Sequence, residues 1–222
     1  MVRLAADLHI HTSCSPCASR AMSPAVIVAE AVRKGIEVIA VCDHNCLDGV
    51  LPVMEAAGSA TGGPRVIPGI EITTVEEVHV LGYFESLEDA RAVAHVAFAD
   101  VSQPHSLGAS RLSLGRILDL IHEHRGLAVA AHVDRGHFSV LSQLGFLSPD
   151  LAFDGLEISG RGVSAGRALE FSTLGFTLVS SSDSHEPGEM GSGITALEVE
   201  EPTIGEMRLA LRGMNGRRCV IA

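Results

Sequence analysis

Short apolar runs alternate with stretches of helical periodicity along almost the whole chain, and this order constrains the fold more than any other feature. The eight runs rich in aliphatic and β-branched residues are 3–10, 37–44, 65–73, 77–84, 126–133, 153–160, 176–183 and 194–200. The helical segments between them are 23–34, 47–60, 87–101, 112–125, 138–145, 163–174 and 203–212. Such alternation predicts βα units around a largely parallel sheet or barrel.

The composition supports one buried core. The chain has 222 residues, of which 46% are hydrophobic and 19% charged, with no Trp and one Tyr, so aliphatic side chains must fill the interior. Nothing in this length requires a split, and we expect a single domain over residues 1–222. Residues 58–64 are a Gly-rich loop, and residues 100–115 are the best candidate for a lid or a shortened insertion.

The sequence also bears on location and partners. No secretory signal and no apolar run of about 20 residues is present, which predicts a cytoplasmic protein without a membrane partner. Five cysteines are best read as reduced thiols. The net charge of −11 makes long nucleic acid an unlikely partner, and it favours a small phosphorylated substrate. The sequence leaves the oligomeric state open.

Histidines and carboxylates fall at the ends of successive apolar runs. They are His9 and His11, Asp43 and His44, Glu71, His79, His132 and Asp134, and Asp183 and His185. In a barrel of βα units the carboxyl ends of the strands share one rim, so these groups are expected to converge. A strand places residues i and i+2 on one face, which directs both His9 and His11 into the same small volume.

So many buried ionisable groups predict a metal centre. Each charged group buried without compensation costs several kcal/mol, and bound cations are the simplest remedy. Imidazole and carboxylate ligands suit Zn, Mn or Fe and fit Ca poorly. The sequence therefore predicts two or three divalent ions. A four-thiolate zinc site from Cys14, Cys17, Cys42 and Cys46 is an alternative, disfavoured because Cys42 is expected to point into a strand interior.

The motifs DLHIHTS, VCDHN, PGIEIT, HVLGY, AAHVDR and SSDSH occur in this order along the chain. This combination resembles the polymerase and histidinol phosphatase (PHP) family of metal-dependent phosphoesterases, and it is most similar to the compact bacterial members. The resemblance implies a distorted (βα)7 TIM-like barrel of the PHP type.

The resemblance also implies ligands for up to three metals. His9, His11 and Asp183 would hold one metal, Glu71 would bridge to a second held by His79 and His132, and His44 and His185 would hold a third. Asp7 and Asp43 would orient ligand imidazoles. Many relatives carry an Asp or a His where this chain has Pro16 and Cys17, so either Cys17 serves as a thiolate ligand or the third site is weak.

The predicted activity is hydrolysis of a phosphomonoester or a short phosphodiester, in a nucleotide, a small metabolite phosphate or an oligonucleotide end. Asp183, His44 and His185 are the candidate catalytic groups, with a metal-activated hydroxide as nucleophile. Arg135 and Arg161 follow strand ends and are candidates for binding phosphate. One alternative is a metal-dependent amidohydrolase, although the only lysine, Lys34, lies in a predicted helix. The other is a non-catalytic metal-binding PHP module.

Overall fold

The computed structural model describes residues 1–99, 108–148 and 150–221. Its strands are β1 (Val2–Ile10), β2 (Val38–Val41), β3 (Arg65–Thr73), β4 (His79–Tyr83), β5 (Leu127–Ala130), β6 (Gly155–Ser159), β7 (Leu178–Ser181), β8 (Thr195–Val199) and β9 (Arg218–Ile221). Its helices are α1 (Pro24–Lys34), α2 (Val50–Ser59), α3 (Leu87–Ala97), α4 (Leu114–Glu123), α5 (Val140–Leu144), α6 (Gly160–Ser164), α7 (Ala168–Ser172) and α8 (Ile204–Leu211), with a short 3-10 turn at Pro187–Glu189.

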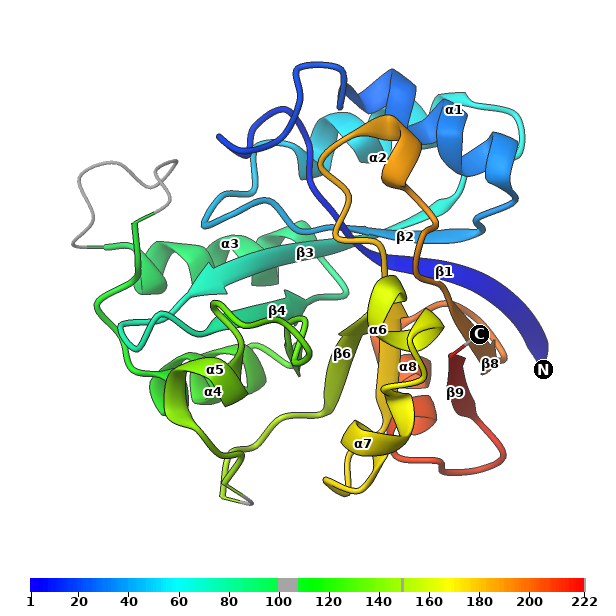
Figure 1. Cartoon of the computed structure of the whole chain (residues 1–222). Helices are drawn as coiled ribbons and strands as arrows, with labels where there is room; N and C mark the ends of the chain where they lie inside the picture. The colour runs from blue at the N-terminus through cyan, green and yellow to red at the C-terminus, as the bar shows by residue number, and fades with distance from the viewer. Residues whose placement is uncertain (100–107, 149, 222) are drawn as a thin grey trace.

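The strands form one sheet in the order β7-β6-β5-β4-β3-β2-β1-β8-β9. The sheet curls until β7 lies beside β1, where a parallel bridge joins Ile10 and Ser184 (Figure 1). The predicted TIM-like barrel is therefore confirmed as a nearly closed, distorted barrel. The lid candidate can be followed only in part, because residues 100–107 lie outside the described residues.

The sheet departs from the expected pattern of parallel strands at β4, at β8, which pairs antiparallel with β1, and at β9. β4 runs antiparallel to both β3 and β5, because a short turn joins β3 directly to β4 with no helix between them. β9, which the apolar pattern did not predict, adds antiparallel to β8 at the sheet edge. The predicted helix over 163–174 is two shorter helices, α6 and α7, separated at Gly166, whose φ of +73° suits glycine.

Helices cover the outside of the barrel (Figure 1). Aliphatic side chains such as Leu8, Val38 and Ile67 fill its inside. Ile27 of α1 and Val53 of α2 pack with Ile39 of β2 on the outer face. α1 begins at a Ser-Pro pair and ends at Gly35, whose left-handed φ of 67° lets its N–H cap two helix carbonyls. Among the described residues, no helix is long and apolar enough to cross a membrane.

A break in the strand regularity of β1 positions the first histidine pair. The pairing register between β1 and β2 shifts between Asp7 and Ile10. The alternation of inward-facing and outward-facing side chains along β1 therefore changes just before the rim. The carbonyl of Leu8 instead accepts hydrogen bonds from the Tyr83 hydroxyl (2.9 Å) and the Cys42 thiol (3.5 Å) inside the barrel. The interior is therefore closed below the rim, and the space above it is lined by polar groups.

Candidate metal centre

The histidines and carboxylates predicted from the strand ends converge at one rim of the barrel. They line a cavity of about 480 Å³ whose walls include Cys17, His44, Glu71, Thr73, His79, His132, Arg135, His137, Phe138, Asp183 and His185. His9 and His11 lie beneath it, fully buried. His79 reaches this rim from the start of β4 rather than from its end, because β4 is antiparallel.

Glu71 is the centre of the cluster. One of its carboxylate oxygens, Oε1, lies 2.7 Å from His79 Nδ1 and 3.2 Å from His132 Nε2. The other, Oε2, lies 2.7 Å from His44 Nδ1 and 3.5 Å from the Nε2 atoms of both His9 and His11. The two oxygens of one buried carboxylate thus face two separate groups of imidazoles.

Several of these short contacts are not hydrogen bonds. The Nδ1 atoms of His44 and His79 and the Oε2 atom of Glu71 are buried and have no hydrogen-bond partner with acceptable geometry. The Nε2 atoms of His9 and His11 lie only 3.1 Å apart. Buried nitrogens and oxygens without hydrogen bonds are costly unless another ligand satisfies them. This donor set fits divalent cations.

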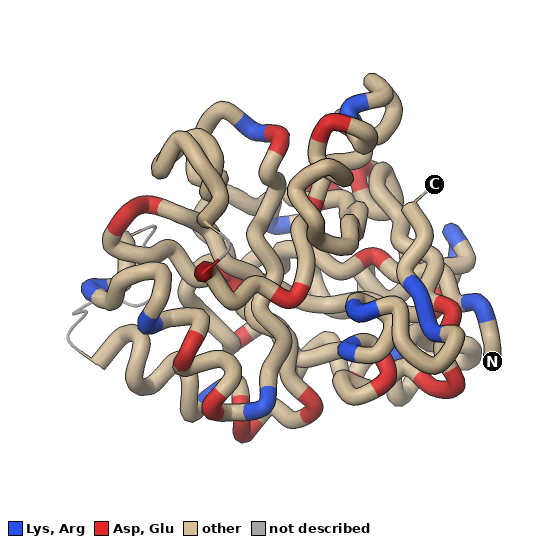
Figure 2. Tube along the Cα trace, turned by 90° about the horizontal axis from the view of Figure 1, so that it is seen from below, with Lys and Arg blue, Asp and Glu red and all other residues tan. Residues whose placement is uncertain are grey.

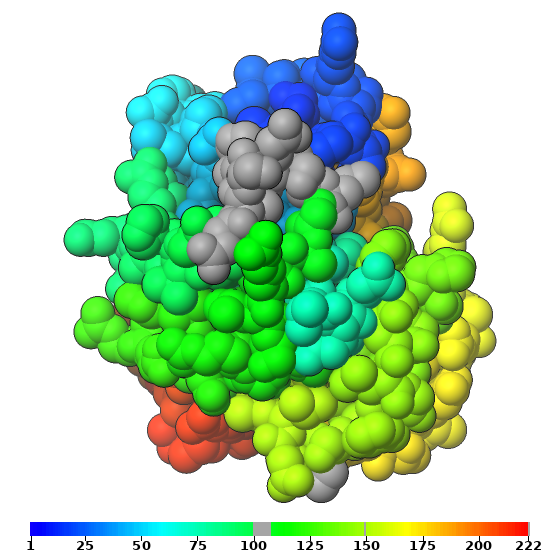
Figure 3. All heavy atoms as spheres, turned by 90° about the vertical axis from the view of Figure 1, so that its left-hand side faces the viewer, coloured from blue at the N-terminus to red at the C-terminus, as the bar shows by residue number. Residues whose placement is uncertain are grey.

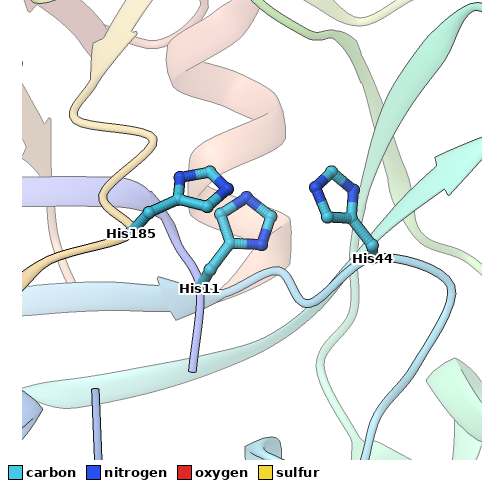
Figure 4. A group of neighbouring side chains, drawn as sticks. All are labelled: His11, His44 and His185. Atoms are coloured by element: carbon cyan, nitrogen blue, oxygen red, sulfur yellow. The ribbon is translucent and has the colours of Figure 1, made fainter. Parts of the chain in front are cut away.

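Three sets of donor atoms are close enough to hold an ion. They are His9 with His11 and Glu71; His44 with Glu71 and His79; and His11 with His44 and His185, with all donor atoms of a set within 4.8 Å. The last three rings come from the end of β1, the loop after β2 and the loop after β7 (Figure 4). His11, His44 and Glu71 are each shared by two of these sets.

Asp183 and Cys17 lie beside these sets. Asp183 Oδ1 is 2.9 Å from His11 Nε2 and 3.4 Å from His9 Nε2, as the predicted first site requires. The Cys17 thiol is 3.1 Å from His185 Nε2. Burial alone would raise the pKa of Cys17, but its hydrogen bonds with His185 and His44 outweigh burial and lower the pKa to about 6. The Cys17 sulfur therefore lies next to the third set, in surroundings that favour its thiolate form.

The buried carboxylates of the cluster favour positive charge on the groups around them. Burial opposes protonation of His9, but the charges of Glu157, Asp183 and Glu71 hold its pKa well above the usual value. Burial likewise opposes protonation of His44, yet the charge of Glu71 raises its pKa to about 10. Burial dominates at His11 and lowers its pKa to about 3. The carboxylates thus draw protons onto two imidazoles, as they would otherwise draw cations.

Glu157 is a site residue that the strand-end pattern missed. It lies within β6, fully buried, and its carboxylate contacts His9 Nδ1 at 3.0 and 3.2 Å and accepts a hydrogen bond of 2.9 Å from the His132 backbone N–H. A carboxylate on Nδ1 makes that nitrogen the donor and leaves Nε2 free to bind a metal. The sequence signal for Glu157 was an acidic residue in the middle of the apolar run 153–160, between Leu156 and Ile158.

The carboxylates expected to orient imidazoles do so less directly. Asp43 accepts a hydrogen bond from the Ser15 hydroxyl (2.6 Å), and that hydroxyl oxygen lies 3.0 Å from His11 Nδ1. Since the Ser15 proton goes to Asp43, His11 Nδ1 is the donor to Ser15 and His11 Nε2 keeps its lone pair. Asp7 accepts instead from the backbone N–H groups of Ser182 and Gly191, which ties β1 to the loops around β7 and β8.

The two candidate phosphate-binding arginines lie in different places. Arg135 lines the cavity and its guanidinium lies 2.5 Å from Asp183 Oδ2. Arg161 is exposed on α6 and is not among the cavity-lining residues. Asp134, at the end of the same run as Arg135, binds the Ser159 N–H and hydroxyl and thereby joins β5 to β6. Only Arg135 is in place to meet a ligand of this cavity.

Solved structures share this fold. The lesion-specific endonuclease PfuEndoQ from Pyrococcus furiosus superposes with a TM-score of 0.82 at 22% identity, over 98% of this chain and 58% of that one. Endonuclease Q in complex with a 27-mer duplex carrying an abasic lesion at the active site gives a TM-score of 0.84 at 23% identity, with the same coverage. The fold therefore recurs within longer proteins.

Curated relatives match parts of the chain. The 5'-3' exoribonuclease Rnm of Escherichia coli is 28% identical over 138 residues, 60% of this chain and 46% of its own length. The uncharacterized protein MJ1587 of Methanocaldococcus jannaschii is 29% identical over 161 residues, 69% of this chain and 80% of its own length. The chain thus spans less than half the length of the exoribonuclease it matches.

The similarity to nucleases corrects one prediction made from the sequence. The prediction that long nucleic acid is an unlikely partner is wrong, because one relative is an exoribonuclease, both similar structures are endonucleases, and one of these structures holds a DNA duplex. The net charge misled because it counts buried carboxylates at full weight: Asp7, Asp43, Glu71, Glu157 and Asp183 are all buried. Basic and acidic residues are interspersed along the chain (Figure 2).

The PHP domain model matches residues 7–140, which is more than half of the chain. The match includes His9, His11, Glu71, His79 and His132, the residues around which the buried cluster is built. The predicted class, a metal-dependent phosphoric ester hydrolase, agrees with the hydrolytic relatives. The chain therefore belongs to the PHP domain family.

Proposed function

We propose that this protein hydrolyses phosphodiester bonds at the ends of oligonucleotides, with nucleotides and other small phosphate esters as lesser substrates. The observation that carries this proposal is the buried carboxylate of Glu71, which faces one group of imidazoles with each oxygen. Such a shared carboxylate suits neighbouring divalent ions. The likeness to the exoribonuclease Rnm supports the choice of a nucleic acid end as substrate.

The metal ligands we propose are His9, His11, His44, Glu71, His79, His132, Asp183, His185 and Cys17. Divalent ions held there would supply Lewis acidity and a water of lowered pKa, which phosphate ester hydrolysis needs. Two or three ions of Zn, Mn or Fe fit the imidazole-rich donor set. Cys17 biases the third set towards zinc, because a thiolate is a soft ligand.

The protein's own side chains would bind the phosphate and protonate the leaving group. Arg135 is 45% exposed and lines the cavity, so its guanidinium can turn from Asp183 to a phosphate oxygen. Where the third set holds no metal, His185, with a 27% exposed side chain, would be the better proton donor to the leaving oxygen. His44 is only 9% exposed and lies 2.7 Å from Glu71, which commits it to the cluster. Asp183 would position His11 and Arg135.

Neither alternative is favoured by a specific observation. Lys34, the lysine that an amidohydrolase with a bridging lysine would need, lies on α1 and donates to the carbonyls of Gly188 and Met190 away from the cavity. A non-catalytic module would not need an arginine at the cavity, yet Arg135 is there.

The test is an assay on end-labelled RNA and DNA oligonucleotides with Mn or Zn, followed by product mapping. Wild-type protein is expected to release mononucleotides from one end, and EDTA is expected to stop this release. Glu71→Gln should abolish the activity, whereas Glu123→Gln, at an exposed surface ion pair, should not. Metal-loaded protein that releases no product from any oligonucleotide or small ester would refute the proposal and favour the non-catalytic module.

A further inference from the structure

An exposed aromatic ring stands at the wall of the metal cavity. Phe138 lines the cavity and is 42% exposed. Among the described residues that line it, Phe138 is the only Phe, Tyr or Trp. The segment that carries it, between β5 and α5, lies against the turn between β3 and β4 on the face drawn in Figure 3. An exposed ring of this size next to a polar cavity does not serve the core.

The ring is held in a fixed orientation. It stacks on the imidazole of His79, with ring centroids 4.6 Å apart and planes 13° from parallel. The carbonyl of Phe138 also accepts a hydrogen bond of 2.8 Å from the His79 backbone N–H. Because His79 covers one face of the ring, the exposed part of the ring is available to a ligand in the cavity.

The backbone at Phe138 is strained. Its φ is +58°, a region that bulky side chains rarely adopt and that costs about 1–3 kcal/mol. The next residue, Ser139, is buried; its hydroxyl donates to the Arg135 carbonyl at 2.8 Å and caps α5. The loop therefore holds an aromatic ring and Arg135 on the same wall, in a conformation that a glycine would adopt more easily.

We propose that Phe138 is a stacking platform for a nucleobase next to the scissile phosphate. This inference rests on the proposed function and names the part of the substrate that the cavity recognises. Arg135 would hold the phosphate and Phe138 the base. Because every base has a flat π face, stacking would favour esters that carry a nucleobase over those that carry only a sugar, with little choice among bases.

A different role for Phe138 would be to hold His79 in place as a metal ligand. The two roles differ in what removal of the ring affects. If Phe138 holds His79 in place, removal of the ring would reduce the amount of bound metal and weaken the binding of every substrate alike. If Phe138 stacks on a base, removal of the ring would leave the metal content unchanged and weaken the binding only of ligands that carry a base.

The experiment measures binding by fluorescence anisotropy. The probes are a phosphorothioate trinucleotide of deoxythymidine labelled with fluorescein, and the same backbone with tetrahydrofuran abasic residues, which keep the charge and lack the bases. Wild type, Phe138→Ala and Phe138→Trp are compared in Mn, and metal content is counted by mass spectrometry. Phe146→Ala is the matched control, since Phe146 is 62% exposed and does not line the cavity.

We expect Phe138→Ala to weaken binding of the base-carrying probe by roughly 5- to 150-fold and to leave the abasic probe unchanged. Phe138→Trp and the control should bind both probes as wild type does. The proposal is overturned by equal weakening of both probes, by loss of metal, by a wild type that does not distinguish the probes, or by no binding to either.

Hydrolysis of the unmodified trinucleotide separates this inference from the proposed function. Base-dependent binding without any product would leave the platform standing and refute the hydrolysis. Release of product at equal rates from esters with and without bases would support the proposed hydrolysis and refute the platform.

Discussion

Replacing Glu157 by glutamine should weaken metal binding without removing any atom that touches the cavity. Glu157 is buried, contacts His9 Nδ1 at 3.0 Å and accepts from the His132 N–H at 2.9 Å. A glutamine keeps one acceptor oxygen. The oxygen that serves His132, Oε2, also lies 3.0 Å from His9 Nδ1, so the glutamine NH2 would take the place of Oε1, 3.2 Å from the same nitrogen. There the NH2 competes as a donor and favours the His9 proton on Nε2, the nitrogen that faces Glu71 and His11.

The expected loss is about 10- to 100-fold in metal affinity, the usual effect of removing a carboxylate behind a ligand imidazole. The assay is competition for Mn or Zn against a calibrated chelator dye, followed by metal counting after desalting. Glu123→Gln is the matched control, because it removes the same charge at a 54% exposed site. Metal affinity of Glu157→Gln within about twofold of wild type would show that Glu157 does not set the state of His9.

Three further predictions concern stability. Chelator treatment should lower the thermal midpoint, and Mn or Zn at 100 times its dissociation constant should restore about 2.7 kcal/mol; an unchanged midpoint would argue against a bound metal. Gly160→Ala should cost roughly 1–3 kcal/mol in urea unfolding, since its Cβ would lie 1.9 Å from the Ser192 carbonyl oxygen, whereas Gly188→Ala meets nothing within 4 Å. Burial raises the pKa of Asp154, but its hydrogen bonds with His122 and the Ala128 N–H, together with the charges of His122 and Arg208, outweigh burial and lower the pKa. Asp154→Asn should therefore cost roughly 1–3 kcal/mol above pH 4, and this loss should shrink as the pH falls through the lowered pKa; a pH-independent loss would refute the linkage.

The sequence predicted the barrel and most of the cluster because both depend on local patterns. Apolar runs and helical spacing report burial along each element, and the order of elements leaves few arrangements. Residues at the ends of parallel strands must meet at one rim, so His9, His44 and His132 could be placed together without knowing the sheet order. His79 reaches the same rim from the start of an antiparallel strand. The end of the barrel at which a residue lies, and not the direction of its strand, therefore decides whether the residue joins the cluster.

The parts that escaped prediction depend on contacts between distant segments. Glu157 lies within a strand and resembles an ordinary alternating residue until His9, 148 positions away, is placed against it. Phe138 reads as the first apolar residue of a helix, and only its left-handed backbone and the His79 ring beside it place it at the cavity. Neither Glu157 nor Phe138 changes the hydrophobic periodicity of the segment in which it lies.

Net charge failed as a guide to partners for a related reason. A formal count gives a buried carboxylate the same weight as an exposed one, but burial and counter-charge decide how much field reaches a partner. Glu71 and Asp183 are surrounded by imidazoles, and their pKa values are lowered because those rings take up positive charge. Bound cations would neutralise the same carboxylates. What a phosphate meets at the cavity is therefore set by Arg135 and by the ions, whereas the charge of −11 describes the chain as a whole.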